Sequence, residues 1–457
     1  MTSLSSAAPS APKPLWRTYL VILIPMMLTN VLQASAGTID TIYLGQMIGV
    51  NALAAVSTFF PIFFFLFAII IGLGSGTTVL IGQAWGAKDL EKVRAVAGTA
   101  LCLMLSLGFA ISMVGSAFAP HLMQLLGTPA NILVDATRYA HLMLLGMPVI
   151  FLLWLMTSMS RGVGDAVTPL WALVLTTLIS LVLTPAFIRG WWGLPHLGVI
   201  SAAASTLIAS VIGIAWMMWH WHRKGHPLAF NEALLNCVRV DGVIARKILS
   251  IGLPSCFQML TMAVAEVVLL GLVNRHGSEA TAAYGAVNQV MSWIQLPAMS
   301  LGISASILAS HAIGAGNGHR LGAIVRTGLG LNLVITGFFV ALVYLLAPTI
   351  IGLFIIDAAV IQMALTLLHI VAWSVIVLGL ATVLTGTMRA SGTVLPPTAL
   401  GVFAILCIEL PVAYVLNARI GIEGIWYAYA LTFVAIFSLN ALYYRLVWRH
   451  KQIARLI

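Results

Sequence analysis

The sequence predicts an all-α integral membrane protein of twelve transmembrane helices, arranged as two pseudo-symmetric six-helix lobes. Three observations predict this fold: the composition is strongly apolar, basic residues alternate between successive loops, and the two halves of the chain repeat one another. Hydrophobic residues make up 61% of the 457 residues and charged residues only 7%, whereas a soluble domain averages about 25% charged residues. Divided into helices of about 20 to 30 residues with short connections, this length accommodates about a dozen spans.

Hydrophobic stretches locate the twelve spans and the segments between them. Residues 1–14 are rich in Ser, Ala and Pro and are expected to form a disordered cytoplasmic tail. The longest polar interval, 222–243, is expected to be a cytoplasmic linker between an N-terminal lobe at 15–221 and a C-terminal lobe at 244–448, and a basic cytoplasmic tail follows at 449–457. The predicted spans are 17–44, 53–82, 95–117, 136–160, 168–188, 198–221, 245–274, 281–312, 323–347, 358–386, 395–417 and 424–447.

The net charge of +10 is distributed as a topology signal. All but four of the 22 Lys and Arg residues lie at the two ends of the chain and in every second loop. An excess of Lys and Arg marks cytoplasmic loops, so both termini are predicted to be cytoplasmic, in a bacterial-type inner membrane. No nucleic-acid partner is expected, and the four cysteines have no paired or metal-type spacing. The four exceptions are Arg138, Arg189, Arg275 and Arg419.

Short motifs recur between the halves at a constant offset of 228 residues. Gly82–Gly86 corresponds to Ser310–Gly314, and Arg161–Gly164 corresponds to Arg389–Gly392. Six spans per half preserve the orientation, so the halves are predicted to be related by an axis along the membrane normal. A substrate path between two like bundles is typical of a transporter. A channel is disfavoured because the deep acids occur singly, without the ring that a filter needs.

Only three of the twelve acidic residues lie deep inside predicted spans, and they are the candidate ion-coupling residues Asp40, Glu266 and Glu409. An ionised carboxylate at membrane depth costs roughly 2.5 to 3.5 kcal/mol on insertion scales, so such a residue indicates function by default. The other nine acids lie in loops or at span ends, where solvated or helix-capping roles are expected.

Asp40 shares the first span with Pro25, which precedes it by fifteen residues, about 22 Å of helix. Proline removes a helical hydrogen bond and clashes with the preceding turn, which favours a hinge. We therefore predict that protonation of Asp40 bends this helix at Pro25. In the alternative interpretation Asn30, Gln33 or threonines satisfy the acid, and the kink is static.

Glu266 follows a second candidate hinge, Pro254, by twelve residues. Gln258 and Met262 lie two turns and one turn before Glu266 on the same helix face. Glu266 is interpreted as a second proton site, a substrate counter-charge, or an acid paired with a buried hydroxyl.

Glu409 stands two residues before a proline and is either a coupling acid or the partner of His369 in a structural pair. Polar and aromatic side chains on other spans are candidates for a substrate cavity, since an aromatic face attracts a cation by roughly 0.5 to 2 kcal/mol. For Asn and Gln, ordinary hydrogen bonds between helices are the alternative. The cavity candidates are Asn30, Gln33, Tyr43, Ser180, Thr184, Gln258, Met262, Asn288 and Trp293.

Several motifs in a fixed order carry a family resemblance. They are Pro25 with Thr38–Gly45, Ala52–Ala55, Gly82–Ala87, Arg161–Asp165 with Thr168 and Pro169, and Gly252–Pro254 with Ala282–Gly285. Through them the chain resembles the multidrug and toxic compound extrusion (MATE) family along nearly its whole length after residue 14. The resemblance implies a V-shaped pair of six-helix lobes and a monomer. It also implies export of small organic, often cationic, compounds against a proton or sodium gradient, with no cofactor beyond that gradient.

The resemblance also assigns two of the acids. Asp40 matches the first-helix acid of the family, and Glu266 lies about one turn from the seventh-helix glutamate of sodium-type members. Where relatives carry an Asn and an Asp before a proline in the fifth helix, this chain has Ser180 and Thr184. The missing carboxylate favours protons over sodium, because hard cations need several oxygen ligands.

The sequence therefore predicts a secondary active exporter of organic cations driven by inward proton flow, working by alternating access. One alternative is a sodium-coupled exporter with its ion near Glu266. A second is a lipid-linked precursor flippase, which is disfavoured because no arginine lies in the interior of a predicted span to hold pyrophosphate. A polytopic membrane enzyme is disfavoured because the loops are short and their charges are scattered.

Overall fold

The computed structural model describes residues 14–355 and 357–457, and all regular elements in these ranges are helical. Within these ranges eleven helices are long and apolar enough to cross a membrane, and the number of candidate spans rises to twelve if the bent pair Leu133–Leu145 and Met147–Gly162 is counted as one. The all-α membrane fold predicted from the sequence is confirmed. The predicted disordered tail lies, except for Pro14, outside the described residues.

The helices of the first half of the chain run to the long connection near residue 230, and those of the second half follow it. The first half contains α1 Leu15–Met47, α2 Val50–Ser57, α3 Phe60–Gly86, α4 Leu90–Leu125, α5 Leu133–Leu145, α6 Met147–Gly162, α7 Val167–Arg189 and α8 Ser201–Arg223. The short α9 Glu232–Leu235 lies in the connection. The second half contains α10 Gly242–Asn274, α11 Ser278–Gly314, α12 Leu321–Gly352, α13 Ala358–Val371, α14 Ser374–Ala390, α15 Leu395–Phe403, α16 Leu410–Ile420 and α17 Glu423–Leu446.

Four predicted spans are not single helices, and most of the breaks have a local cause. The predicted span 53–82 is divided between α2 and α3, and Pro61 stands in the first turn of α3, where proline is tolerated because its N–H is not needed. The span 136–160 bends by 50° between α5 and α6. The span 358–386 breaks between α13 and α14, where the Tyr344 hydroxyl donates to His369 O and accepts from Trp373 N, both at 3.1 Å.

The span 395–417 is interrupted by a π-helical segment, Ala404–Glu409, which joins α15 to α16. Pro411 follows this segment and has no N–H to donate to the carbonyl one turn earlier. A widened turn before such a proline is a common way to relieve the conflict, and π-helical turns are frequent at functional sites. The π-helical segment ends at Glu409, one of the three predicted coupling acids.

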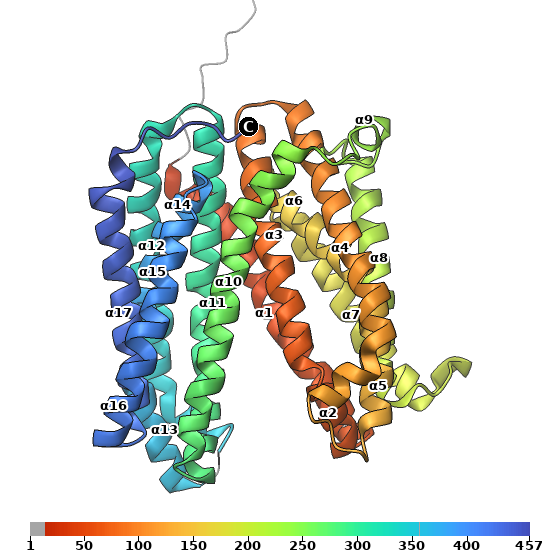
Figure 1. The fold of residues 1–457 in the computed structure, drawn as a ribbon, viewed down its shortest axis with the longest axis vertical. Coiled ribbons are helices and arrows are strands. Elements are labelled where there is room, and N and C mark those ends of the chain that lie inside the picture. The colour runs from red at the N-terminus through yellow and green to blue at the C-terminus, as the bar shows by residue number, and fades with distance from the viewer. Residues whose placement is uncertain (1–13, 356) are drawn as a thin grey trace, which may run out of the picture.

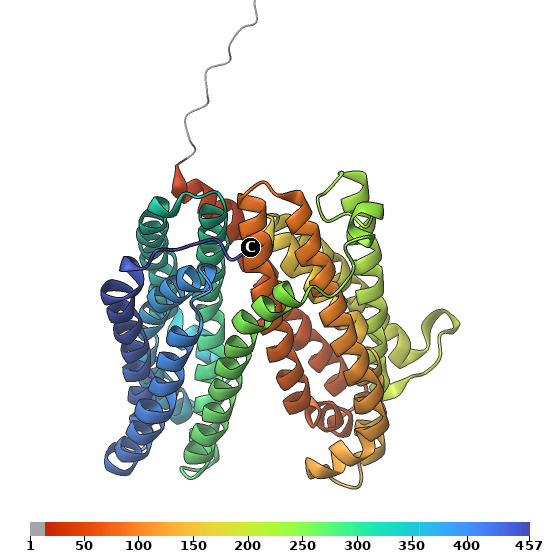
Figure 2. The same cartoon turned by 45° about the horizontal axis from the view of Figure 1, so that its top comes forward.

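Two groups of helices meet near one end of the molecule and separate toward the other (Figure 1). The end at which they meet carries the turns at 87–89, 163–166, 224–241, 315–320 and 391–394, and we call it the basic end. After α17 the chain crosses this end from one group to the other, as Figures 1 and 2 both show.

Two long helices each pack against both halves. Tyr19, Leu23 and Met26 of α1 are buried in a cluster with residues of α11, α12 and α14. Conversely, Ile248 and Ile251 of α10 are buried with residues of the first half. Each helix therefore begins in the other half's core, and the two candidate hinge prolines, Pro25 and Pro254, lie close to the ends of these segments.

Candidate functional site

The acid of the first half, Asp40, lies on α1 beside α7. Thr184 of α7 is fully buried and donates its hydroxyl hydrogen to Asp40 Oδ1 at 3.3 Å. Tyr139 of α5 lies within electrostatic range of Asp40. Asp40 itself is only partly buried, so this carboxylate has one long hydrogen bond and remains open to further donors.

The helix that carries Asp40 continues without interruption through Pro25, from Leu15 to Met47. Thr29 donates its hydroxyl hydrogen to Pro25 O at 2.7 Å, whereas the carbonyl that loses its helical donor because of Pro25 is that of Val21, one turn earlier. Asn30, one residue further on, donates from Nδ2 to Ser300 Oγ of α11 at 2.9 Å. The Pro25 region is therefore where α1 passes from contacts with the second half to contacts with the first.

The acid of the second half, Glu266 on α10, is surrounded by donors from two other helices. Tyr284 OH lies 2.5 Å and Asn288 Nδ2 lies 2.6 Å from Glu266 Oε1. Tyr429 OH of α17 lies 2.7 Å from Glu266 Oε2, and the two tyrosine oxygens are 2.9 Å apart. We call Glu266, Tyr284, Asn288 and Tyr429 the Glu266 cluster.

A count of hydrogens bears on the state of this cluster. The contacts among Glu266, Tyr284 and Tyr429 form a closed ring of three oxygen–oxygen contacts, and each hydrogen bond in it needs one hydrogen. The two tyrosines supply one each, because a phenol has a single O–H. The ring is fully hydrogen-bonded only when the carboxyl group of Glu266 carries the third. The cluster is therefore well suited to hold a proton.

Glu409 is the most buried of the three acids, with 6% of its surface exposed, and it lies within electrostatic range of Glu266. The alternative expectation that Glu409 pairs with His369 is wrong. His369 instead contacts Leu365 O through Nδ1 at 2.6 Å, and its ring stacks on Tyr344 with centroids 5.2 Å apart. His369, which is exposed near the break between α13 and α14, therefore makes these contacts with its own helix and with α12, not with Glu409.

The other predicted residues divide between these two sites and the rest of the molecule. The structure brings Thr184 to Asp40 and Asn288 to Glu266. Gln258 packs against Gly401 of α15, away from both hydrogen-bond networks. Tyr43 lines a shallow surface pocket of about 360 Å³ with Pro185 and Arg189 among its walls. The remaining candidates, Gln33, Ser180, Met262 and Trp293, are partly or largely exposed on their helices.

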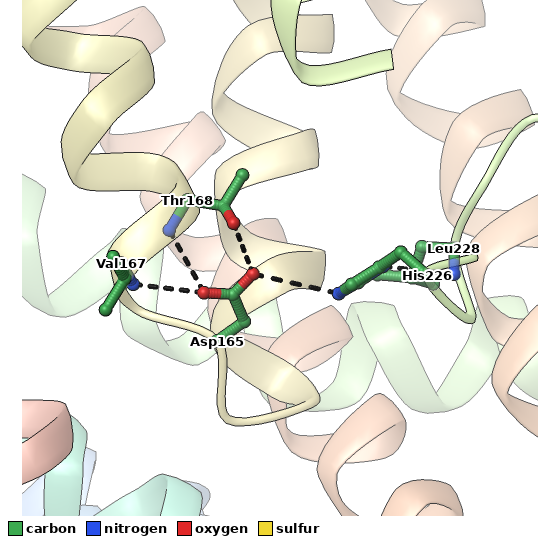
Figure 3. A network of polar contacts seen from close by, with 5 residues as sticks. All are labelled: Asp165, Val167, Thr168, His226 and Leu228. Atoms are coloured by element: carbon green, nitrogen blue, oxygen red, sulfur yellow. Dashed lines mark hydrogen bonds and ion pairs between the residues drawn. The ribbon is translucent and has the colours of Figure 1, made fainter. Parts of the chain in front are cut away.

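The acid of the Arg161–Asp165 motif has a capping role, as expected for acids at span ends. Asp165 accepts from the backbone N–H of Val167 at 3.1 Å and of Thr168 at 3.0 Å, at the start of α7 (Figure 3). His226 lies 3.8 Å from the same carboxylate and accepts from Leu228 N through Nδ1. Burial lowers the pKa of His226, and the charge of Asp165 opposes that change only in part. Burial therefore disfavours the charged form of this imidazole.

The tyrosines at both acids were missed by the sequence reasoning. Tyr139, Tyr284 and Tyr429 lie in apolar spans, where a tyrosine is ordinarily interpreted as a packing residue or as a residue at the membrane interface. A usable signal existed only for Tyr284, which lies one helical turn before Asn288 and so shares its helix face. No group of three His, Cys, Asp or Glu side chains able to hold a metal ion occurs in residues 14–355 and 357–457.

Comparison with known proteins places these features in a family. The family model described as MatE matches residues 25–186 and again residues 254–415. The chain is 39% identical over 444 residues to a protein of Bacillus subtilis (strain 168) named probable multidrug resistance protein YoeA, covering 97% of this chain and 96% of that one. It is 22% identical over 421 residues to multidrug export protein MepA of Staphylococcus aureus (strain bovine RF122 / ET3-1), covering 91% and 90%.

Solved structures share the fold. The chain matches an outward-facing multidrug resistance MATE family transporter with a TM-score of 0.87 and 24% identity, covering 94% of this chain and 95% of that one. It matches a mutant of the Vibrio cholerae MATE transporter VcmN with a TM-score of 0.88 and 21% identity, covering 96% and 98%. The two matches of one family model, with starts 229 residues apart, agree with the internal repeat seen in the sequence.

Proposed function

The chain belongs to the MatE family, and from that membership we propose that it exports small organic, often cationic, compounds in exchange for protons. As a member of this family it is a multidrug efflux transporter and not an enzyme, and such transporters need no prosthetic cofactor. The compounds exported and the coupling ion belong to the proposal, as do a monomeric state and lobes at 15–221 and 244–448 joined by the linker 222–243.

One observation carries the choice of protons. Each half of the chain holds a deep carboxylate beside hydroxyl donors, Asp40 beside Thr184 and Glu266 beside Tyr284 and Tyr429. Neutral hydroxyl groups suit a carboxyl group that gains and loses a proton, because they hydrogen-bond to both forms. A sodium ion would need several oxygen ligands free to face it, whereas both carboxylate oxygens of Glu266 already accept hydrogen bonds.

In the proposed cycle Asp40 is the principal coupling acid. Protonation removes its charge and α1 bends near Pro25. The open end of the molecule then closes, and the closed end opens. Glu266 and the neighbouring Glu409 form a second proton site. The distribution of Lys and Arg supports cytoplasmic termini in a bacterial inner membrane, so the end closed in this structure is the cytoplasmic one.

Sodium-coupled export through Glu266 is the second candidate. It is favoured by the nearness of Glu409, since two acidic side chains lie within electrostatic range of one another there. A lipid-linked precursor flippase of the same superfamily is the third candidate. It is disfavoured because this chain has no arginine in the interior of a predicted span to bind a pyrophosphate group.

Transport in reconstituted proteoliposomes tests the proposal. Efflux of a fluorescent cationic dye is measured under an imposed pH gradient and, separately, under an imposed sodium gradient, for wild type and for Asp40→Asn. Dye movement driven by the pH gradient and lost in the variant is the expected result. Movement driven only by sodium would refute proton coupling, and no movement under either gradient would refute cationic dyes as substrates.

A further inference from the structure

After α17 the chain crosses the basic end as a strap, which Figures 1 and 2 both show. The strap, residues 451–457, contains no helix or strand. Its start is fixed to the second half, because the preceding Trp448 is 2% exposed and donates from Nε1 to Ser391 Oγ at 2.9 Å. Ile453, inside the strap, packs against the same buried cluster as Trp448, which is built mostly from the second half and the start of α1. The first part of the strap therefore belongs to the second half.

The far part of the strap docks on the first half. Leu456 N donates at 2.7 Å to Oε1 of Gln83, which lies near the end of α3. Leu456 O accepts from Nζ of Lys247, in a segment of α10 that is buried against the first half. The side chains of Leu456 and Ile457 pack against the same cluster of mainly first-half residues, which reaches Val394 of the second half. The strap thus joins the two halves.

Gln83 and Leu456 form the junction between the halves under the strap. Gln83 is 1% exposed and donates from Nε2 to Ala390 O, at the end of α14, at 2.7 Å, while its Oε1 accepts from the strap. Gly392, whose φ of +78° favours glycine, lies beneath the Leu456 side chain, and a Cβ atom there would be 2.8 Å from Leu456 Cδ2. Leu456 therefore touches the first half through its backbone and the second half through its side chain.

The basic end is closed around this junction. A Cβ atom at Gly86 would collide with the backbone of His311, and one at Gly314 would collide with the backbone of Gln83. The ends of α3 and α11 therefore touch backbone to backbone. Because a single residue, Leu456, bridges the two halves beside them, the strap has no slack at this point. When the halves separate at the basic end, Leu456 must lose its contacts with one of them.

We propose that the strap is an autoinhibitory lock, which holds the basic end closed while Leu456 is docked and must release Leu456 before that end opens. Undocking exposes the leucine side chain to water and removes a hydrogen-bond donor from the buried Gln83 Oε1, so both effects favour the closed end. In the proposed cycle this end admits compounds from the cytoplasm, and the lock therefore limits their uptake. The inference rests on the proposed alternation between two open ends, but not on which compound or ion is moved.

Spin-label distances at the basic end test the proposal directly. Glu91 and His319 are exposed residues near the starts of α4 and α12, one in each half. Both are changed to cysteine for labelling after the four native cysteines are replaced. Distances are recorded at one fixed pH, without substrate or gradient, so that neither the compound nor the coupling ion enters the measurement. Thermal unfolding of every variant is recorded beside the distances.

Three variants separate the lock from a general effect on the strap. Leu456→Pro removes the N–H that donates to Gln83, together with most of the docked side chain. Lys247→Met removes the donor to Leu456 O and keeps the length of the side chain. Gln452→Pro is the matched control, because Gln452 is an exposed strap residue whose N–H makes no hydrogen bond to the described residues.

The population with separated labels is expected to rise at least threefold in Leu456→Pro, to rise less in Lys247→Met, and to stay unchanged in Gln452→Pro. No rise in Leu456→Pro, or an equal rise in Gln452→Pro, would overturn the lock. A lower melting temperature with unchanged distances would also overturn it, because the strap would then support only the fold. A failure of proton-driven dye efflux would instead overturn the coupling proposal and leave this measurement unaffected.

Discussion

The carboxylates of the two halves lie in opposite surroundings. Asp40 has one hydroxyl at 3.3 Å from the neighbouring α7, whereas Glu266 has three donors at 2.5 to 2.7 Å from α11 and α17. A carboxylate with a single long hydrogen bond loses little hydrogen-bond free energy when the neighbouring helices move. A group inside a closed ring can exchange its proton only after the ring opens. From this difference we propose that Asp40 exchanges protons in this conformation and that Glu266 stores one.

The largest expected effect comes from removing the charge of the first acid. Asp40→Asn should lower pH-driven dye efflux at least about tenfold, equivalent to about 1.4 kcal/mol or more, because the amide has no proton to exchange. Expression and melting temperature should stay close to wild type, since only one long hydrogen bond is altered. Glu266→Gln is the matched control in the other half. A larger loss of efflux in Glu266→Gln than in Asp40→Asn would reverse the proposed roles.

Breaking the ring around Glu266 should have the next largest effect, this time on stability. Tyr429→Phe removes one hydroxyl from a buried site and leaves two oxygens without that partner, which should cost about 1 to 3 kcal/mol. Glu266→Gln should cost less than about 1 kcal/mol, because a glutamine amide both donates and accepts, as a protonated carboxyl group does. Thermal unfolding in detergent measures both variants. If Glu266→Gln proved the more destabilising, the carboxyl group would not be protonated in this state.

The contrast between the two acids could be predicted only in part. The positions of Asp40 and Glu266 follow from the sequence because a charge stands out in an apolar span. The tyrosines do not, because a membrane helix is apolar on all sides and hydropathy then gives no indication of which face meets which neighbour. The positions of the spans could be predicted because a long apolar stretch is easily recognised in a sequence. The breaks in four spans could not, because a stretch stays apolar across a break such as those at Gly146 and Trp373.

The hinge proline of α1 gives a smaller expected effect. The structure shows α1 continuous through Pro25, so the role of this residue would lie in bending during the cycle and not in this conformation. Pro25→Ala restores a backbone N–H and should stiffen the helix. We expect efflux to fall about threefold, or about 0.6 kcal/mol by the relation between rate and barrier, with unchanged or higher thermal stability. Pro254→Ala in α10 is the matched change, and equal losses in both would indicate that both helices bend.

Thr184→Val should produce the smallest change in efflux of these variants. Valine has nearly the shape of threonine but no hydroxyl, so Asp40 loses its hydrogen bond while the packing of this fully buried side chain is kept. A bond of 3.3 Å is long for an O–H donor, and we therefore expect at most about a twofold change in efflux, about 0.4 kcal/mol. The measurement is the initial rate of dye efflux over a series of external pH values. A loss as large as that in Asp40→Asn would mean that Thr184 holds Asp40 in place as firmly as the Glu266 cluster holds its acid, and that the two halves differ less in function than in geometry.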